Sequence, residues 1–297
     1  MKVVSWNILA NEFIKKSYYP TIKSKMLFNR KGRLAHITII LKNVDADVML
    51  LQEVMGAEYN SLYETFDKDY YIIQGDSINW SNKKTYSGNV TFLRKGVFFL
   101  SANTENAVIN YLPFGIYVKC YFLDVRDNER DNIKNNNVKN PGCENMCTVT
   151  SALPYQGKVN KNDGDKLRSN DKLTPIDIIN VHLDYNSHSK RIAEIKSIES
   201  VITKTKRVIL GGDFNQDYKP NSKLYKLLNQ AMRLKMYIKD PTYFVEKEIC
   251  IDHIMTKGIY GGIYGNSCGC VVNNYGDDFL QQFTDYGSDH LPIIAKI

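Results

Sequence analysis

The chain contains little cysteine, and its cysteines are widely spread. Six thiols in 297 residues are too few for the dense disulfide framework of small secreted proteins. Their spacing forms no convincing zinc motif, although pairing of the 143/147 and 268/270 cysteines stays open. We therefore expect scattered free thiols and an intracellular protein, with the cytoplasm as the favoured compartment. The six are Cys120, Cys143, Cys147, Cys250, Cys268 and Cys270.

Long apolar runs are also missing. No run approaches the roughly 18 residues that a membrane-spanning helix needs. The first residues, from Lys2 to Asn7, already read as a strand that ends in a polar motif. We therefore expect no transmembrane segment and no signal peptide.

Acidic residues are nearly missing from the first 42 positions. Between Lys2 and Lys42 there are nine Lys and Arg residues and one acid, Glu12, which leaves the rest of a +7 chain close to neutral. Such a run is usually a solvated basic face, but it also suits a polyanionic partner such as nucleic acid or a phospholipid surface. Aromatic residues interleaved with the cations could stack bases, or could pack onto the domain. The candidate substrate-binding residues are Lys15, Lys16, Lys23, Lys25, Tyr18 and Tyr19.

The most informative stretch runs from Arg207 to Asn215. The apolar run Val208 to Leu210 reads as a buried strand, and the glycine pair that follows allows a sharp turn or close approach of a ligand. Asp213 and Asn215 lie two positions apart, so in extended chain their side chains point the same way. A carboxylate and a carboxamide projecting together from the rim of a sheet suit an anionic substrate held by a metal.

Five further segments place polar residues beside an apolar strand. Four of these apolar runs lead into their polar residues, and in the fifth the polar residues come first. One strand tipped with a polar residue is ordinary, but six such segments indicate a single shared site. The five are Val3 to Asn7, Val48 to Glu53, Ile176 to His182, Ile249 to His253, and Ser288-Asp289-His290 before Leu291 to Ala295.

In this set and order the six motifs resemble the endonuclease/exonuclease/phosphatase superfamily. They are Trp-Asn, Leu-Gln-Glu-Val, Asn-Val-His-Leu, Gly-Gly-Asp-Phe-Asn, Ile-Asp-His-Ile and Ser-Asp-His-Leu-Pro, and they span residues 3 to 292. The resemblance implies an α/β fold, a four-layer sandwich in which two mixed β-sheets pack face to face with helices outside. The site is then expected at the strand ends.

The resemblance also implies a role for each motif residue. Glu53 is a principal metal ligand, Asn7 orders the metal shell and the phosphate, and Asp289 contributes to metal binding or positions the neighbouring histidine. Asp213 orients or deprotonates the attacking water. Asn215 and His182 donate to phosphate oxygens, and an Asp252–His290 pair stabilises charge as an imidazolium. Hard oxygen ligands suit Mg²⁺, with Mn²⁺ as a substitute.

Two departures from the superfamily pattern restrict the branches of the superfamily that this chain resembles. Trp6-Asn7 is followed by Ile8-Leu9-Ala10, where abasic-site endonucleases carry an acid. Deoxyribonuclease I carries a Glu that orients the equivalent of His182, where this chain has Ser87, Gly88 and Asn89. The motifs instead look like the deadenylase, nocturnin and Angel-type branch.

The sequence therefore predicts a Mg²⁺-dependent phosphoesterase. The leading interpretation is a nuclease that degrades RNA from the 3′ end, with poly(A)-like RNA as substrate. The alternatives are a phosphatase or phosphodiesterase for a small phosphorylated metabolite, nucleotide or phospholipid, a DNA endonuclease, and a binding module that has lost catalysis.

A single domain over residues 1–297 is expected because the motifs alternate along the whole length. Residues 126–173 are rich in Asn, Lys and Asp and poor in apolar side chains, which predicts a mobile polar insertion. Helices are expected at 31–42, 57–66, after Ser187 and at 222–234. Strands are expected at 70–74, 89–94 and 115–124, and residues 258–286 give no clear assignment.

Overall fold

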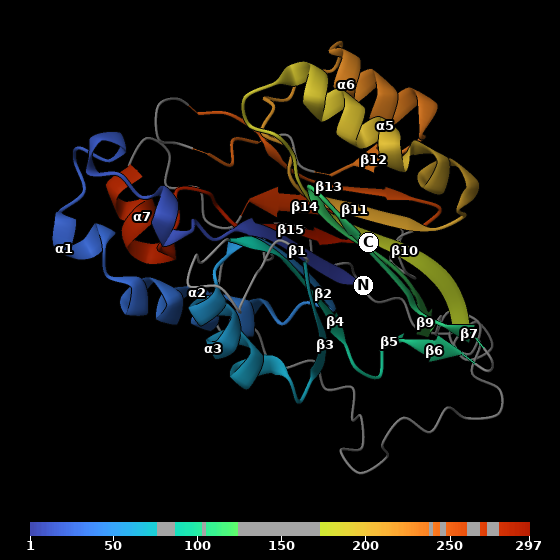
Figure 1. The fold of residues 1–297 in the computed structure, drawn as a ribbon, viewed down its shortest axis with the longest axis horizontal. Coiled ribbons are helices and arrows are strands. Elements are labelled where there is room, and N and C mark those ends of the chain that lie inside the picture. The colour runs from blue at the N-terminus through green and yellow to red at the C-terminus, as the bar shows by residue number, and fades with distance from the viewer. Residues whose placement is uncertain are drawn as a thin grey trace, which may run out of the picture.

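The computed structural model has two β-sheets stacked face to face, with helices on both outer faces (Figure 1). It describes residues 1–75, 87–102, 105–123, 173–237, 240–243, 248–259, 268–271 and 279–297. This is the predicted four-layer α/β sandwich.

The first sheet is mixed, because β1 runs parallel to β2 and antiparallel to β15. The order across the sheet is β14-β15-β1-β2-β4-β3, so strands from both halves of the chain alternate in it. Their bounds are β1 Lys2–Asn7, β2 Val48–Val54, β3 Tyr70–Gln74, β4 Gly88–Arg94, β14 Cys268–Val271 and β15 Ile293–Lys296.

The second sheet is also mixed, with β10 parallel to β11 and antiparallel to β9. Its order is β12-β13-β11-β10-β9-β5, and β8 pairs with β9 beside that path. The bounds are β5 Phe98–Phe99, β8 Val108–Leu112, β9 Gly115–Leu123, β10 Leu173–His182, β11 Val208–Asp213, β12 Lys235–Met236 and β13 Asp252–Lys257. A separate two-stranded ribbon joins β6 Ser101–Ala102 to β7 Glu105–Asn106.

The helices occupy both outer faces of the sandwich. In Figure 1, α2 Arg30–Val44 and α3 Gly56–Phe66 lie on the side of the first sheet, while α5 His188–Lys204 and α6 Lys223–Lys226 lie on the side of the second. The short α1 Ser24–Leu27 and α7 Phe279–Tyr286 lie together at one end of the sandwich (Figure 1). Within the described ranges, further turns of helix lie at Asn11–Phe13, Lys16–Tyr18 and Leu227–Ala231. No helix in the described ranges is long and apolar enough to cross a membrane.

Alternation along β10 shows how the layers are held together. Ile176 and Ile178 belong to the cluster between the sheets, whereas Ile179 and Val181 belong to the cluster beneath α5. Successive side chains of a strand point to opposite faces, so one strand serves both cores. On α5 the isoleucines Ile192, Ile195, Ile198 and Ile202 are buried, and the Ser187 side chain accepts a hydrogen bond from Lys190 N, as expected of an N-cap.

A buried polar network also joins the two sheets. Asn180 of β10 lies fully buried between them, and its amide donates to Leu51 O at 3.1 Å and Val90 O at 3.0 Å. Gln52 Nε2 donates to Asn180 Oδ1 at 2.8 Å. Because buried polar groups are costly when unpaired, this network fixes the relative position of β2 and β10, which carry Glu53 and His182 at their ends.

The structure changes several expected boundaries. The 222–234 helix is only α6 followed by a π-helical turn, and residues 11–27 contain three short helical turns. The expected strand over Ile249 to Ile251 is wrong: β13 begins at Asp252 and runs antiparallel to β11, so Asp252 opens its strand. Leu173 starts β10, so it does not belong to the predicted insertion. The rest of that insertion, Asp124 of the predicted 115–124 strand, and much of 258–286 lie outside the described residues.

Gly212 shows why the central strand ends in two glycines. Its φ is +144°, and an added Cβ would lie 1.8 Å from Val181 O on the neighbouring strand. A contact with backbone cannot be relieved by a side-chain rotation. We expect Gly212→Ala to lower the free energy of unfolding by about 4 kcal/mol or more, the range of severe backbone clashes. The measurement is urea unfolding followed by circular dichroism.

Gly96→Ala is the matched control for that prediction. Gly96 also has a positive φ, +79°, but nothing lies within 4 Å of its Cβ position. Its cost should be about 1 kcal/mol, from backbone strain alone. Equal losses in the two variants would contradict the steric explanation.

Candidate active site

The predicted motif residues come together at one edge of the sandwich. Register explains the convergence: Asn7 pairs with Gln52 across β1 and β2, His182 with Asp213 across β10 and β11, and Asp213 with Asp252 across β11 and β13. The end of β11 therefore meets the start of β13.

Asn7 links acids from the two sheets. Its Nδ2 donates to Glu53 Oε1 at 2.8 Å and to Asp213 Oδ2 at 3.1 Å, and Ala10 N donates to Glu53 Oε2 at 2.8 Å. Leu9 N donates to Asn7 Oδ1 at 3.0 Å, which fixes the amide orientation. One carboxamide thus sets the separation of the two carboxylates.

Glu53 reaches this position through an irregular backbone. Its φ is +58°, a left-handed conformation that is rare for residues other than glycine. The pairing of β2 with β4 shifts register between Leu51 and Val54, as at a β-bulge. Strain of this kind often accompanies function, because it aims a side chain where a regular strand would not.

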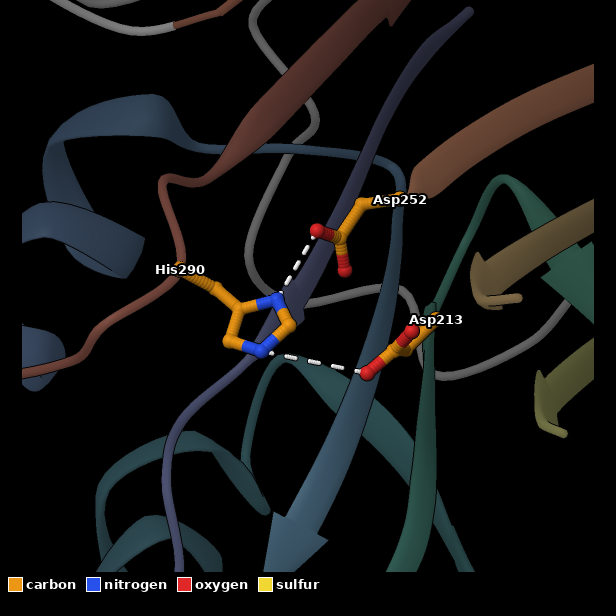
Figure 2. A group of neighbouring side chains, drawn as sticks. All are labelled: Asp213, Asp252 and His290. Atoms are coloured by element: carbon orange, nitrogen blue, oxygen red, sulfur yellow. Dashed lines mark hydrogen bonds and ion pairs between the residues drawn. The ribbon is translucent and has the colours of Figure 1, made fainter. Parts of the chain in front are cut away.

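His290 lies between two aspartates, as Figure 2 shows. Its Nδ1 is 2.9 Å from Asp252 Oδ2, and its Nε2 is 3.8 Å from Asp213 Oδ2. Burial lowers the pKa of His290, but the charge of Asp252, the hydrogen bond to it and the charges of Asp289 and Asp213 together raise that pKa well above its ordinary value. The charged imidazolium is therefore the form that this pocket stabilises.

Backbone contacts hold the segment that carries His290. Trp6 Nε1 donates to His290 O at 3.0 Å, and Ser288 Oγ donates to Asn7 O at 2.7 Å. The Trp-Asn motif therefore positions the Ser-Asp-His motif from the far end of the chain. The ring of Tyr243 lies 4.9 Å from the His290 ring, a neighbour that the sequence did not reveal.

His182 approaches Asp213, as His290 does. Its Nε2 is 3.8 Å from Glu53 Oε1 and 3.6 Å from Asp213 Oδ2, and its side chain is partly exposed. A cavity of about 130 Å³ opens beside it, lined by residues that include Asn89 and Phe114. His182 can therefore meet a group that enters from solvent.

Asn215 lies two residues beyond the end of the central strand, with a φ of +49°. Its backbone N donates to Asp213 Oδ1 at 2.7 Å, and its Nδ2 donates to Leu183 O at 2.9 Å. The first bond helps orient Asp213. Since an amide nitrogen carries two hydrogens, a second donor is available for the predicted phosphate contact.

The positive groups near the site do not fully compensate the negative charge of its buried carboxylates. Burial is the main cause that raises the pKa of Glu53, and burial followed by the charge of Asp252 raises the pKa of Asp213. Asp252 Oδ1 and Asp289 Oδ1 are buried and have no hydrogen-bond partner within the described ranges. A divalent cation would satisfy such oxygens, so the residues present fit the predicted metal.

Two sets of side chains could hold that cation. Asp213, Asp252 and His290 place one ligand atom each within 4.8 Å of one another. The Glu53 side offers carboxylate oxygens, which Mg²⁺ prefers over imidazole nitrogen, and Asn7 orders the Glu53 carboxylate through its amide nitrogen. We therefore keep Glu53, Asn7 and Asp289 as the expected magnesium side and treat His290 as a proton-bearing group.

Two of the expected substrate-binding residues need correction. Tyr19 is only 3% exposed, so its ring offers no open face for a base. The Lys16 ammonium donates to three backbone carbonyls of its own loop, those of Tyr19, Pro20 and Ile22, so it stabilises that loop. The Tyr19 ring is therefore buried by packing, and the Lys16 ammonium is bound to its own loop.

The other four expected substrate-binding residues lie on the surface. Lys15, Lys23, Lys25 and Tyr18 are exposed. Lys15 Nζ lies 5.2 Å from the centroid of the Tyr18 ring, an arrangement suited to a stacked, negatively charged strand.

Fold and site together define a phosphoesterase-type protein: a four-layer sandwich with buried carboxylates and two histidines at one edge. The family model described as the Endonuclease/Exonuclease/phosphatase family matches residues 4–290, and the chain belongs to that family. Its members are hydrolytic phosphoesterases. A search of curated proteins found no match.

Solved structures share the fold at low sequence identity. The crystal structure of ANGEL2, a 2′,3′-cyclic phosphatase, is 14% identical, with a TM-score of 0.60 over 99% of this chain and 93% of that chain. The human Nocturnin catalytic domain with bound sulfate is 14% identical, with a TM-score of 0.58 over 99% and 93%. Truncated Caenorhabditis elegans TDP2 is 14% identical, with a TM-score of 0.52 over 99% and 95%.

Proposed function

We propose that this protein is a Mg²⁺-dependent nuclease that hydrolyses RNA from the 3′ end, with poly(A)-like RNA as the leading substrate and Mn²⁺ as a substitute metal. The observation that carries the proposal is the joining of Glu53, Asn7 and Asp213 to the His290–Asp252 pair at one edge of the sandwich. An intracellular, cytoplasmic setting fits this role.

The residues divide the reaction between them. Asp213, held by Asn7 and the backbone of Asn215, orients the attacking water and accepts its proton. His290, kept charged by Asp252, donates to the phosphate as negative charge develops, and His182 and Asn215 donate to it as well. Glu53, Asn7 and Asp289 would hold the Mg²⁺ ion. When bound, the ion would polarise the phosphate and stabilise the leaving oxygen.

Similarity in fold is consistent with RNA-end chemistry but leaves the substrate open. ANGEL2 is described as a 2′,3′-cyclic phosphatase, and Nocturnin was solved with a bound sulfate anion. A second candidate is therefore a small phosphoester. The cavity of about 130 Å³ beside His182 supports it, since a space of this size takes one ring.

The basic surface separates the two candidates. A polymer contacts several phosphates at once, and each lost contact lowers both affinity and its dependence on salt. We expect Lys15→Ala, Lys23→Ala and Lys25→Ala together to raise KM for oligo(A) about tenfold at 0.1 M salt and to flatten its salt dependence. The measurement is steady-state hydrolysis with Mg²⁺ of oligo(A), oligo(dA) and a minimal phosphodiester.

The minimal diester is the internal control, because it reaches only the acidic site and its turnover should not change. A triple substitution of Lys68, Lys95 and Lys204, which are exposed and lie outside the basic run, serves as the matched surface control. If KM for oligo(A) is unaffected and independent of salt, the small-phosphoester candidate replaces the nuclease. If no phosphoester is hydrolysed with Mg²⁺, both candidates fail.

A further inference from the structure

Tyr19 is fixed within a small apolar cluster beside the acidic site. The residue is 3% exposed, and its ring centroid lies 6.0 Å from that of Phe283 on α7. Leu9, Ile14, Ile22 and Leu27 complete the cluster. A ring surrounded in this way has one orientation, so its hydroxyl group is aimed by packing.

That hydroxyl group is aimed at a carboxylate of the Ser-Asp-His motif. Tyr19 Oη donates to Asp289 Oδ2 at 2.9 Å in a buried hydrogen bond that joins residues 270 positions apart. The other oxygen, Oδ1, is buried and has no hydrogen-bond partner in the described part of the chain. Oδ2 of Asp289 is therefore held by a hydrogen bond, and Oδ1 is left for a ligand.

The surrounding contacts hold this pair against the site. Asp289 adjoins His290 and is close enough to Glu53 for its charge to act on that carboxylate. Buried Arg33 donates from Nη1 to Gly287 O at 2.8 Å and from Nη2 to Leu9 O at 2.7 Å, which ties together the segments on either side of Tyr19 and Asp289.

We propose that Tyr19 is a positioning residue for metal binding: its hydroxyl group holds Asp289 so that Oδ1 faces a divalent cation shared with Glu53. The inference rests on the proposed metal-dependent function. It gives Tyr19 a role behind the metal site in place of the base stacking expected from the sequence. Partners that orient a ligand in this way change metal affinity when they are removed.

Tyr19→Phe is the direct test, because it removes one oxygen and keeps the ring. We expect Mn²⁺ and Mg²⁺ to bind about 10- to 100-fold more weakly, the usual effect of losing such a partner. Isothermal titration calorimetry with each metal alone measures this without turnover. Saturating Mg²⁺ should restore kcat to within a few-fold, because no reacting group has changed.

Tyr18→Phe is the matched control, since Tyr18 is 52% exposed and its hydroxyl group lies 3.4 Å from Lys15 Nζ. It should bind metal like the unaltered protein. Asp289→Asn should weaken metal binding in the same way, and adding Tyr19→Phe to it should cause little further loss. This cycle keeps the test decisive even if one single variant folds poorly.

Unchanged metal affinity in folded Tyr19→Phe overturns the inference, and so does a loss that adds fully to that of Asp289→Asn. Either result leaves the proposed function intact if the unaltered protein still needs Mg²⁺ to hydrolyse a phosphoester. Failure of the unaltered protein to bind either metal overturns the proposed function itself.

Discussion

Asp213→Asn is expected to lower kcat by on the order of 10³-fold or more, with little change in KM, as for other members of a catalytic group. Asp213 is 1% exposed, and both of its oxygens accept hydrogen bonds, Oδ2 from Asn7 and Oδ1 from the Asn215 backbone. The amide keeps the side-chain volume but replaces one of these acceptors by a donor. The variant loses the group that takes the proton of the attacking water. Single-turnover hydrolysis in Mg²⁺ measures the effect.

The thermal stability of Asp213→Asn distinguishes this loss of activity from misfolding, because the variant is expected to be more stable and a misfolded protein would be less stable. The folded-state pKa of Asp213 is raised, first by burial and then by Asp252, so without metal the charged carboxylate opposes folding. That penalty is absent below the unfolded pKa near 4 and develops as pH rises through the folded value. The metal-free variant should therefore have a higher Tm than the unaltered protein at pH 7 and the same Tm at low pH.

Two controls accompany the Asp213 experiment. Glu53→Gln should also lose most activity, because Glu53 Oε1 and Oε2 are both held in the site. Glu64→Gln, at an exposed position of α3, should change neither activity nor Tm. Near-normal turnover of Asp213→Asn would show that catalysis occurs elsewhere.

Asp252→Asn is expected to lower kcat by about 10² to 10⁴-fold, comparable with the loss of an aspartate that orients a catalytic histidine in other enzymes. Asp252 is fully buried and supplies the negative charge and the hydrogen bond that raise the pKa of His290. Without that charge, burial is less opposed and the pKa of His290 falls. The imidazolium is then lost at neutral pH.

The pH dependence of kcat should differ between the unaltered protein and Asp252→Asn. A histidine whose folded pKa is raised stays charged until the pH passes that value, so the unaltered protein should show no loss from this group through neutral pH. In Asp252→Asn the loss should begin at lower pH and be smallest under mildly acid conditions. Combining His290→Ala with Asp252→Asn should cost little more than His290→Ala alone, and fully additive losses would contradict the pairing.

The convergence of the motif residues could be predicted from the sequence because its signal is local. Each motif places a polar residue beside an apolar strand, and parallel or antiparallel pairing then brings those ends together, as with Asn7, Glu53 and Asp213. Asp252 was expected at the end of a strand, but it lies at the start of one. The apolar run before it looked like the strand, whereas pairing to β11 selects the residues after it.

Contacts between distant segments could not be predicted in the same way. Tyr19 and Lys16 were grouped by composition with the exposed lysines, but apolar neighbours and backbone carbonyls use their side chains. Arg33 was counted as surface charge and is buried between two loops. Asn180 did leave a local signal, a polar residue within an apolar strand, but its partners lie on the other sheet.

The placement of β1 between β2 and β15 has a consequence for synthesis on the ribosome. One edge of β1 pairs with β2 soon after both emerge, but the other waits for Ile293–Lys296. At about 5 to 20 residues per second, that interval is roughly 15 to 60 s. Throughout it the nascent chain exposes an unpaired, apolar strand edge, and His290 has not yet joined the acids. Nascent chains stalled before residue 290 should therefore bind a holdase chaperone at the β1 edge, and release of the last strand should displace it.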